Sequence, residues 1–192
     1  MTNVVSQSPL SYGLLVDPSR RTLFAMPYPH KLDEERILEE ATRLVDEHGL
    51  DGLSTRVLAK RLGARAPSLY RYFPDKEELV RAVGARFLGQ LIAELAPHPT
   101  LVGMARAYWA YVLRYPRRYE VIFHRPPDSE PLLAWAANIA PARPLPTAHA
   151  IWSYLHGAAT LRLATPAADG PDAEEAFELG LLALERGLHG PL

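Results

Sequence analysis

Residues 54–76 read STRVLAKRLGARAPSLYRYFPDK, and this stretch decides the fold of the chain. A short helical pattern over residues 54–62 is followed by a tight turn at 63–65 and by a second short helix near 67–72. The turn starts with glycine, which adopts the positive φ that a sharp reversal needs, and Pro67 suits a first helical turn, where its missing N–H costs nothing. These proportions predict a helix-turn-helix, a motif whose second helix enters the major groove of DNA.

Positive charge is concentrated in the same stretch. It holds six basic residues and one acid, a net charge of +5, although the whole chain of 192 residues carries −1. A basic segment in a slightly acidic protein is typical of a phosphate-binding surface, and a solvated helix face is the alternative interpretation. The six basic residues are Arg56, Lys60, Arg61, Arg65, Arg71 and Lys76.

Helices are predicted on both sides of this stretch. Asp33 is expected to cap a helix that ends at Gly49, and Asp75 with Glu78 forms a D-x-x-E capping box that opens a long helix. Apolar residues at helical spacing give each helix one inward face. The predicted core positions are Ile37, Leu38, Ala41, Leu44 and Val45, then Leu58, Leu62, Leu69 and Phe73, then Leu79, Val83, Phe87, Leu91 and Leu95.

The rest of the chain also predicts helices, separated by proline. Residues 141–146 contain three prolines and are expected to form a rigid, non-helical loop. A second D-x-x-E box, Asp172 with Glu175, is expected to start the last helix. The predicted helices span residues 100–115, 117–123, 129–139, 147–164 and 172–187.

Several functional classes are excluded by what the sequence lacks. The chain has no cysteine, so a disulfide framework and thiolate chemistry are ruled out. No apolar run reaches membrane-spanning length and no signal peptide is visible, so the expected location is the cytoplasm. The seven histidines show no metal-ligand spacing, and no G-x-S-x-G or glycine-rich phosphate loop occurs. We expect no enzyme activity, no cofactor and no metal.

The motif has a specific resemblance. The string L-Y-x-Y-F-x-x-K-x-x-L over residues 69–79, together with the preceding short helix, resembles the DNA-binding head of the tetracycline-repressor (TetR) family across residues 33–83. The resemblance implies that Pro67 and Ser68 approach base edges, and that Arg56 and Arg71 reach a base or the backbone. It further implies phosphate contacts from Ser54, Thr55, Tyr70, Tyr72 and Lys76.

Two positions depart from the family pattern. Arg65 stands where the family often has a capping hydroxyl, and Ala66 cannot make a polar base contact. Sequence readout is therefore expected to depend on Arg56, Arg65 and contacts with thymine methyl groups.

The C-terminal part resembles the TetR subgroup with a W-x-x-x-H-G motif, matched here by Trp152, His156 and Gly157. The resemblance implies an effector pocket, and Gly157 is expected to mark a close helix crossing. A plain core is the alternative for the pocket. The predicted pocket residues are Met104, Tyr108, Tyr111, Tyr115, Phe123, Trp152 and His156.

Dimerisation through the last two long helices is also implied by the resemblance. The alternative is that these apolar stripes only build the core of one chain. The predicted interface comprises Ile151, Leu155, Ala158, Ala159 and Arg162 in one helix and Ala176, Phe177, Gly180, Leu181 and Leu184 in the other.

Together these features predict an all-α, homodimeric regulator of transcription that binds double-stranded DNA. Residues 1–30 form an N-terminal extension, loose or hairpin, with Met26 as an alternative start; residues 31–80 form the DNA-binding domain and residues 81–192 the effector-binding and dimerisation domain. The leading hypothesis is a repressor released from a palindromic operator by a small molecule. The alternative is an effector-independent dimeric activator or structural DNA-binding protein.

Overall fold

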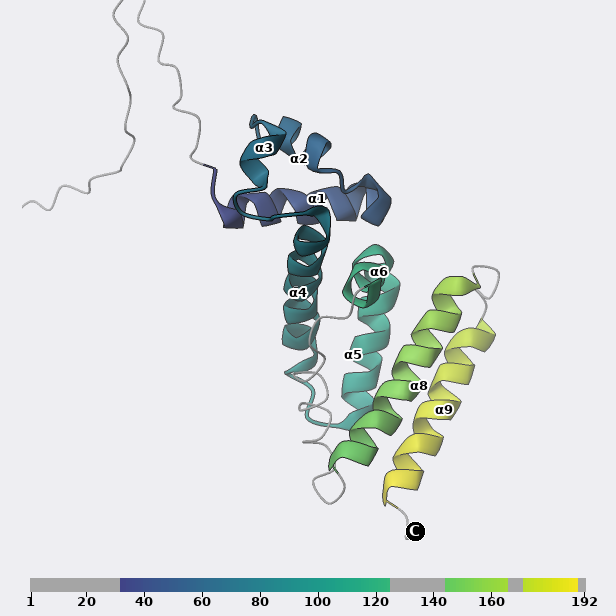
Figure 1. The fold of residues 1–192 in the computed structure, drawn as a ribbon. Coiled ribbons are helices and arrows are strands. Elements are labelled where there is room, and N and C mark those ends of the chain that lie inside the picture. Colours follow the sequence, from purple (N-terminus) through teal and green to yellow (C-terminus); the bar gives the residue numbers. More distant parts are fainter. Residues whose placement is uncertain (1–31, 125–143, 166–170, 190–192) are drawn as a thin grey trace, which may run out of the picture.

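The computed structural model describes residues 32–124, 144–165 and 171–189, and in these ranges every regular element is a helix (Figure 1). This confirms the all-α fold class. The N-terminal extension and the helix predicted over residues 129–139 lie outside the described residues. The helices are α1 (Glu34–Gly52), α2 (Thr55–Arg61), α3 (Ala66–Leu69), α4 (Lys76–Leu95), α5 (Leu101–Arg114), α6 (Pro116–His124), α8 (Pro144–Ala164) and α9 (Pro171–His189).

The helices form a small head on one end of a longer bundle. Figure 1 shows α1 lying across the end of α4, with α2 and α3 on the far side of α1. Below them α4, α5 and α6 pack together, and the pair α8 and α9 packs against α5. One apolar cluster runs through both parts, so the head and the bundle share a continuous core.

Helix α1 starts as predicted. The carboxylate of Asp33 accepts a hydrogen bond from the backbone N–H of Arg36 at 2.8 Å, and the predicted inward residues are buried except Leu38, which is half-buried. Gly49 has a φ of 70°, which interrupts the regular helix at the predicted place. One more turn nevertheless carries α1 to Gly52, beyond the predicted end.

The turn between α2 and α3 is a Schellman motif. Gly63 has a φ of 64°, its N–H donates to the carbonyl of Lys60 at 3.2 Å, and the N–H of Ala64 donates to the carbonyl of Ala59 at 2.9 Å. These two bonds satisfy carbonyls that the end of α2 would otherwise leave unpaired. Helix α3 is shorter than predicted and ends at Leu69.

Helix α4 joins the head to the bundle. Asp75 accepts a hydrogen bond from the N–H of Glu78 at 2.8 Å, which confirms the predicted cap, and all five predicted inward residues from Leu79 to Leu95 are buried. Gly84 lies where α4 meets α6, since a Cβ placed on it would be 3.3 Å from the carbonyl oxygen of Val121. The absence of a side chain allows this close approach.

Two predicted boundaries in the bundle are wrong. Residues 144–146 belong to α8 and not to a loop, because Pro144 and Pro146 fall in its first turn, where proline's missing N–H is tolerated. Helix α9 begins at Pro171, so Asp172 lies in its first turn and does not precede it.

Candidate nucleic-acid interface and cavities

The residues predicted to contact DNA lie in and beside α2 and α3, and at the start of α4. Figure 1 shows α2 and α3 at the free end of the head, whereas α4 starts on the other side of α1. Six of the predicted residues are exposed: Arg56, Arg65, Pro67, Tyr70, Arg71 and Lys76. Four are half-buried: Ser54, Thr55, Ser68 and Tyr72. Contact with DNA stays a prediction for all of them.

The basic residues of this stretch divide into two kinds. Arg61 points back into the head, where its guanidinium binds Glu47 at 2.5 Å and Glu40 at 3.2 Å and lowers the pKa of Glu47 by hydrogen bonding. In the described part of the chain no ion pair is recorded for the other five cations. We call these five residues the free cations: Arg56, Lys60, Arg65, Arg71 and Lys76.

Two polar side chains of the predicted set are bonded differently from what was expected. The hydroxyl of Tyr72 donates to the backbone carbonyl of Leu32 at 2.5 Å, so its single proton holds the residue before α1, and its contact with a phosphate stays a prediction. Ser54 occupies the N-cap of α2, but its side chain makes no capping hydrogen bond, which leaves the hydroxyl free for another acceptor or donor.

Helix α6 grips the end of α1. The Nη1 of Arg117 donates to the carbonyls of Asp46 and Glu47 at 2.8 and 2.7 Å, next to the interruption at Gly49. Arg118 binds both carboxylate oxygens of Asp46 at 2.7 and 2.8 Å and stacks on the ring of Tyr115 at 4.0 Å. Sequence reasoning missed this joint, because an arginine pair after a proline does not indicate its partner.

The predicted effector residues form an aromatic cluster between α5, α6 and α8. Met104, Tyr108 and Tyr111 are fully buried, and Tyr115, Phe123, Trp152 and His156 are half-buried. The ring of Trp152 stacks on His156 at 5.1 Å, and Phe123 lies against both. The first three residues thus belong to the packed core, which was the alternative for the pocket.

A chain of hydrogen bonds crosses this cluster. Tyr108 donates to the hydroxyl of Tyr119 at 3.0 Å, and that hydroxyl lies 2.7 Å from Nδ1 of His156. Since Tyr119 accepts from Tyr108, its own proton is available for Nδ1 of His156, an arrangement that suits a neutral imidazole. Burial lowers the pKa of His156 in agreement with this, and burial raises the pKa of Tyr119 to about 12.

A cavity of about 930 Å³ opens where the head meets the bundle. We call it the junction cavity. Of the predicted pocket residues, only Phe123 and His156 line it. Its other lining residues are His48, Gly49, Leu50 and Asp51 from α1, Pro116, Arg117, Tyr119, Glu120 and His124 from α6, and Thr160, Leu163 and Ala164 from α8.

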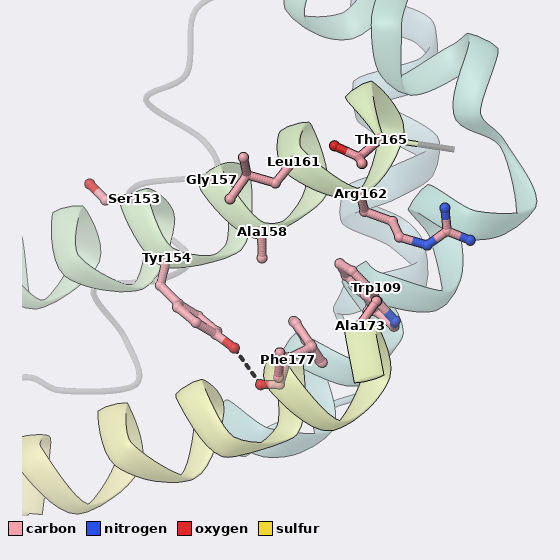
Figure 2. A pocket seen from close by; sticks show the side chains of 11 residues that line it. Trp109, Ser153, Tyr154, Gly157, Ala158, Leu161, Arg162, Thr165, Ala173 and Phe177 are labelled. Atoms are coloured by element: carbon pink, nitrogen blue, oxygen red, sulfur yellow. Dashed lines mark hydrogen bonds between the residues drawn. The ribbon is translucent and has the colours of Figure 1, made fainter. Parts of the chain in front are cut away.

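A second hollow of about 500 Å³ lies between α8 and α9, over Trp109 of α5 (Figure 2). Tyr154 bridges its floor and donates a hydrogen bond to the carbonyl of Phe177, drawn as the dashed line in Figure 2. Gly157 borders this hollow, and a Cβ on it would meet nothing within 4 Å, so the expected close crossing is wrong. The close approach occurs instead at Gly180, against the ring of Tyr154.

The predicted dimer stripe faces mostly inward. Ile151, Leu155, Ala159, Phe177 and Leu181 are buried within the single chain, so these positions build its own core. The apolar residues left exposed on the same two helices include Leu145, Leu161, Leu179 and Leu182, with 62%, 70%, 62% and 38% exposure.

The described residues contain no group of histidines and acids that could hold a metal ion. None of the helices described is both long enough and apolar enough to cross a bilayer.

Comparisons with known proteins agree with this architecture. Residues 37–83 match the family model described as bacterial regulatory proteins, tetR family, and residues 101–184 match the tetracyclin repressor-like C-terminal domain. The narrower W-x-x-x-H-G resemblance stays a prediction.

Individual relatives match over different lengths. The HTH-type transcriptional regulator Rv0681 of Mycobacterium tuberculosis is 30% identical, with 83% of each chain covered. The class A tetracycline repressor of transposon 1721 from Escherichia coli is 34% identical, over 44% of this chain and 42% of the repressor. A TetR variant of Acinetobacter baumannii, solved in complex with minocycline, superposes with a TM-score of 0.63 at 25% identity and covers 83% of this chain and 100% of its own.

Proposed function

Since the chain belongs to the tetR family of bacterial DNA-binding transcriptional regulators, we propose that it is a dimeric repressor, released from a palindromic operator when a small molecule binds its bundle. It would act in the cytoplasm, where the operator is. Relatives across the family are regulators and not enzymes, in line with the lack of catalytic motifs in this sequence.

The free cations carry this proposal. Four of these basic side chains lie in or beside α2 and α3, and Lys76 is the first residue of α4. None of the five has an ion pair among the described residues, whereas Arg61 in the same stretch binds two glutamates. Unpaired, exposed cations around a short helix are what a phosphate backbone requires, since contacts to phosphates hold the helix in register while its first residues read bases. Pro67 and Ser68 at the start of α3 occupy that reading position.

A second copy is the proposed cover for α8 and α9. Leu161 is exposed at the hollow that Trp109 and Phe177 also line. Leu179 and Leu182 are exposed on α9, and apolar surface of this kind favours association. A two-fold axis through this face would place two heads on one duplex, with half-sites about 34–36 Å apart.

Release by an effector is proposed from the contacts that Arg117 and Arg118 of α6 make with α1. The minocycline-bound relative shows that a member of this family takes a small molecule. In this chain α6 carries the two arginines that bind α1, Arg117 and Arg118. The same helix carries Tyr119 and Phe123, whose rings contact each other in the aromatic cluster. A ligand that binds one head arrangement better than the other would shift the population off DNA.

Selection of bound duplexes from a random DNA pool tests the proposal. We expect an inverted repeat with one helical turn between half-sites, and binding that weakens steeply as salt rises. The Arg56→Ala variant should select a less defined sequence. Enrichment of no sequence, or of a single half-site bound by a monomer, would contradict the proposal.

The alternative function, an effector-independent dimeric activator or structural DNA-binding protein, predicts the same repeat. It differs in a gel-shift titration across a metabolite library. If no compound changes operator affinity, the effector-independent regulator is the better description.

A further inference from the structure

We propose that the junction cavity is the effector site and that it takes planar aromatic cations of drug-like size. This inference rests on the proposed function for its regulatory part, but the binding itself can be tested without DNA.

The junction cavity is large and has an aromatic wall. A volume of about 930 Å³ accommodates a molecule of several fused rings. Tyr119, Phe123 and His156 line one side of the cavity and lie within 6 Å of one another, measured between ring centroids. Apolar side chains of Leu50, Leu163 and Pro116 add to this surface. Such a wall favours a flat, largely apolar ligand.

The charged side chains that line the junction cavity are one arginine and two carboxylates. Arg117 is the one arginine that lines the cavity, and its guanidinium is already bound to the carbonyls of Asp46 and Glu47. Asp51 and Glu120 line the cavity as well, and no hydrogen bond or ion pair is recorded for either carboxylate within the described ranges. The lining therefore carries two carboxylates against one guanidinium, and this net negative charge favours a cation over an anion.

The protonation state of His156 also affects the charge of the cavity wall. The hydroxyl of Tyr119 lies 2.7 Å from its Nδ1, and burial lowers the pKa of His156, which favours the neutral imidazole that does not repel a cationic ligand. A smaller neighbouring cavity of about 300 Å³ is lined by Asp51 together with Lys76 and Glu77. Because Lys76 and Glu77 have opposite charges, they add no net charge beside Asp51.

The junction cavity lies between the head and the bundle. His48, Gly49, Leu50 and Asp51 belong to the last turns of α1 in the head, whereas the remaining lining residues belong to α6 and α8 in the bundle. An occupant therefore touches both parts at once, next to the point where Arg117 holds α1. Any movement of α1 against α6 changes the shape of this site, which gives the ligand a preference for one head position.

The binding test compares two dyes that share a xanthene ring, cationic rhodamine 6G and anionic fluorescein, by fluorescence anisotropy on the full chain without DNA. We expect rhodamine 6G to bind about tenfold more tightly or better than fluorescein. The double variant Asp51→Asn, Glu120→Gln should lose about fivefold in rhodamine 6G affinity. Glu174→Gln, an exposed carboxylate on α9, is the matched control and should change nothing.

A steric variant localises the binding. Ala164 is exposed and lines the cavity, so Ala164→Trp should obstruct part of it without disturbing the core and should weaken rhodamine 6G binding about tenfold or more. Equal affinity for both dyes, an unchanged double variant, or an equal loss in Glu174→Gln would overturn the proposal. Thermal melts of each variant show that the folded state is retained.

Operator binding separates this inference from the proposed function. Rhodamine 6G should weaken operator binding of the parent chain and should affect that of Ala164→Trp much less. If the dye binds as expected but operator affinity does not respond, the cavity is not the effector site. If the chain binds no duplex DNA at all, the regulator fails while the dye data stand on their own.

Discussion

The arginines of α2 and those of α6 have the same chemistry and opposite uses. In and beside α2 and α3, the side chains of Arg56, Arg65 and Arg71 are exposed and make no ion pair within the described chain. On α6, by contrast, Arg117 and Arg118 are bound to the end of α1. Arg61 belongs to α2 by sequence and to the second group by contact. The comparison teaches that a basic stretch becomes a binding surface only through those cations that the fold leaves unpaired.

The largest expected effect is a loss of operator affinity when free cations of the head are removed. The double variant Arg71→Ala, Lys76→Ala should lose at least about 100-fold in operator affinity at low salt, since charge-assisted contacts contribute about 1.5–3 kcal/mol each. The slope of log K against log salt should fall by about 0.9 per lost phosphate contact. Titrations at several salt concentrations measure both quantities.

Arg61→Ala is the control for that experiment. It removes one positive charge from the same stretch but no free cation, so the salt slope should stay unchanged. A slope reduced as much as in the double variant would show that Arg61 leaves its glutamates to contact DNA.

A smaller effect is expected on the α6 side. Arg118→Ala should lower the free energy of unfolding by about 1–2 kcal/mol, because it removes a bidentate contact to Asp46 and the stack on Tyr115. Arg114→Ala, exposed and without an ion pair recorded in the described residues, should cost less than about 0.5 kcal/mol. Urea denaturation distinguishes the two, and equal losses would mean that the joint contributes no stability.

The turn that presents the free cations gives a third, still smaller effect. Gly63→Ala should destabilise the chain by about 1 kcal/mol, because an alanine at a φ of 64° is strained even though no atom lies within 4 Å of its Cβ. Gly89→Ala has equally open space on a regular stretch of α4 and should instead stabilise by about 0.5–1 kcal/mol. Denaturation curves that move in the same direction for both variants would contradict the backbone argument.

The smallest effect concerns pH. Burial lowers the folded-state pKa of His156, so the unfolded chain takes up this proton first as the pH falls. The stability that neutral His156 contributes is complete above a pH of about 6.5, the unfolded pKa, and is lost below it towards the lower folded pKa. Melting temperatures at pH 8 and 5 should differ less in His156→Gln than in the parent chain, and an identical difference would remove His156 from the pH dependence.

Local features were predictable from the sequence and long-range partners were not. The caps at Asp33 and Asp75 and the turn at Gly63 depend on residues within five positions, so composition and spacing were sufficient. Periodicity also identified the buried faces of α1 and α4. It did not reveal that Tyr72 would donate to Leu32, forty residues earlier, or that Arg61 would bind Glu40.

The predicted dimer interface was only partly separable from the core for a related reason. An apolar stripe shows that a face is covered but not by which neighbour, and so Leu155 and Phe177 were assigned to a partner chain although they are buried in their own. The junction cavity was missed because α1, α6 and α8 each contribute a few ordinary residues to it. Only the crossing of these helices brings them together.

Helix α4 acts as a lever between the two regions. Its 20 residues span about 30 Å, from Lys76, which is one of the free cations, to Leu95, which is buried in the bundle. A tilt of about 5° at the bundle end displaces the other end by roughly 2.6 Å, which is close to the length of a whole hydrogen bond. A slight repacking around Gly84 and Val121, far too small to alter the fold, is thus large enough at the tip to take a lysine out of reach of its phosphate.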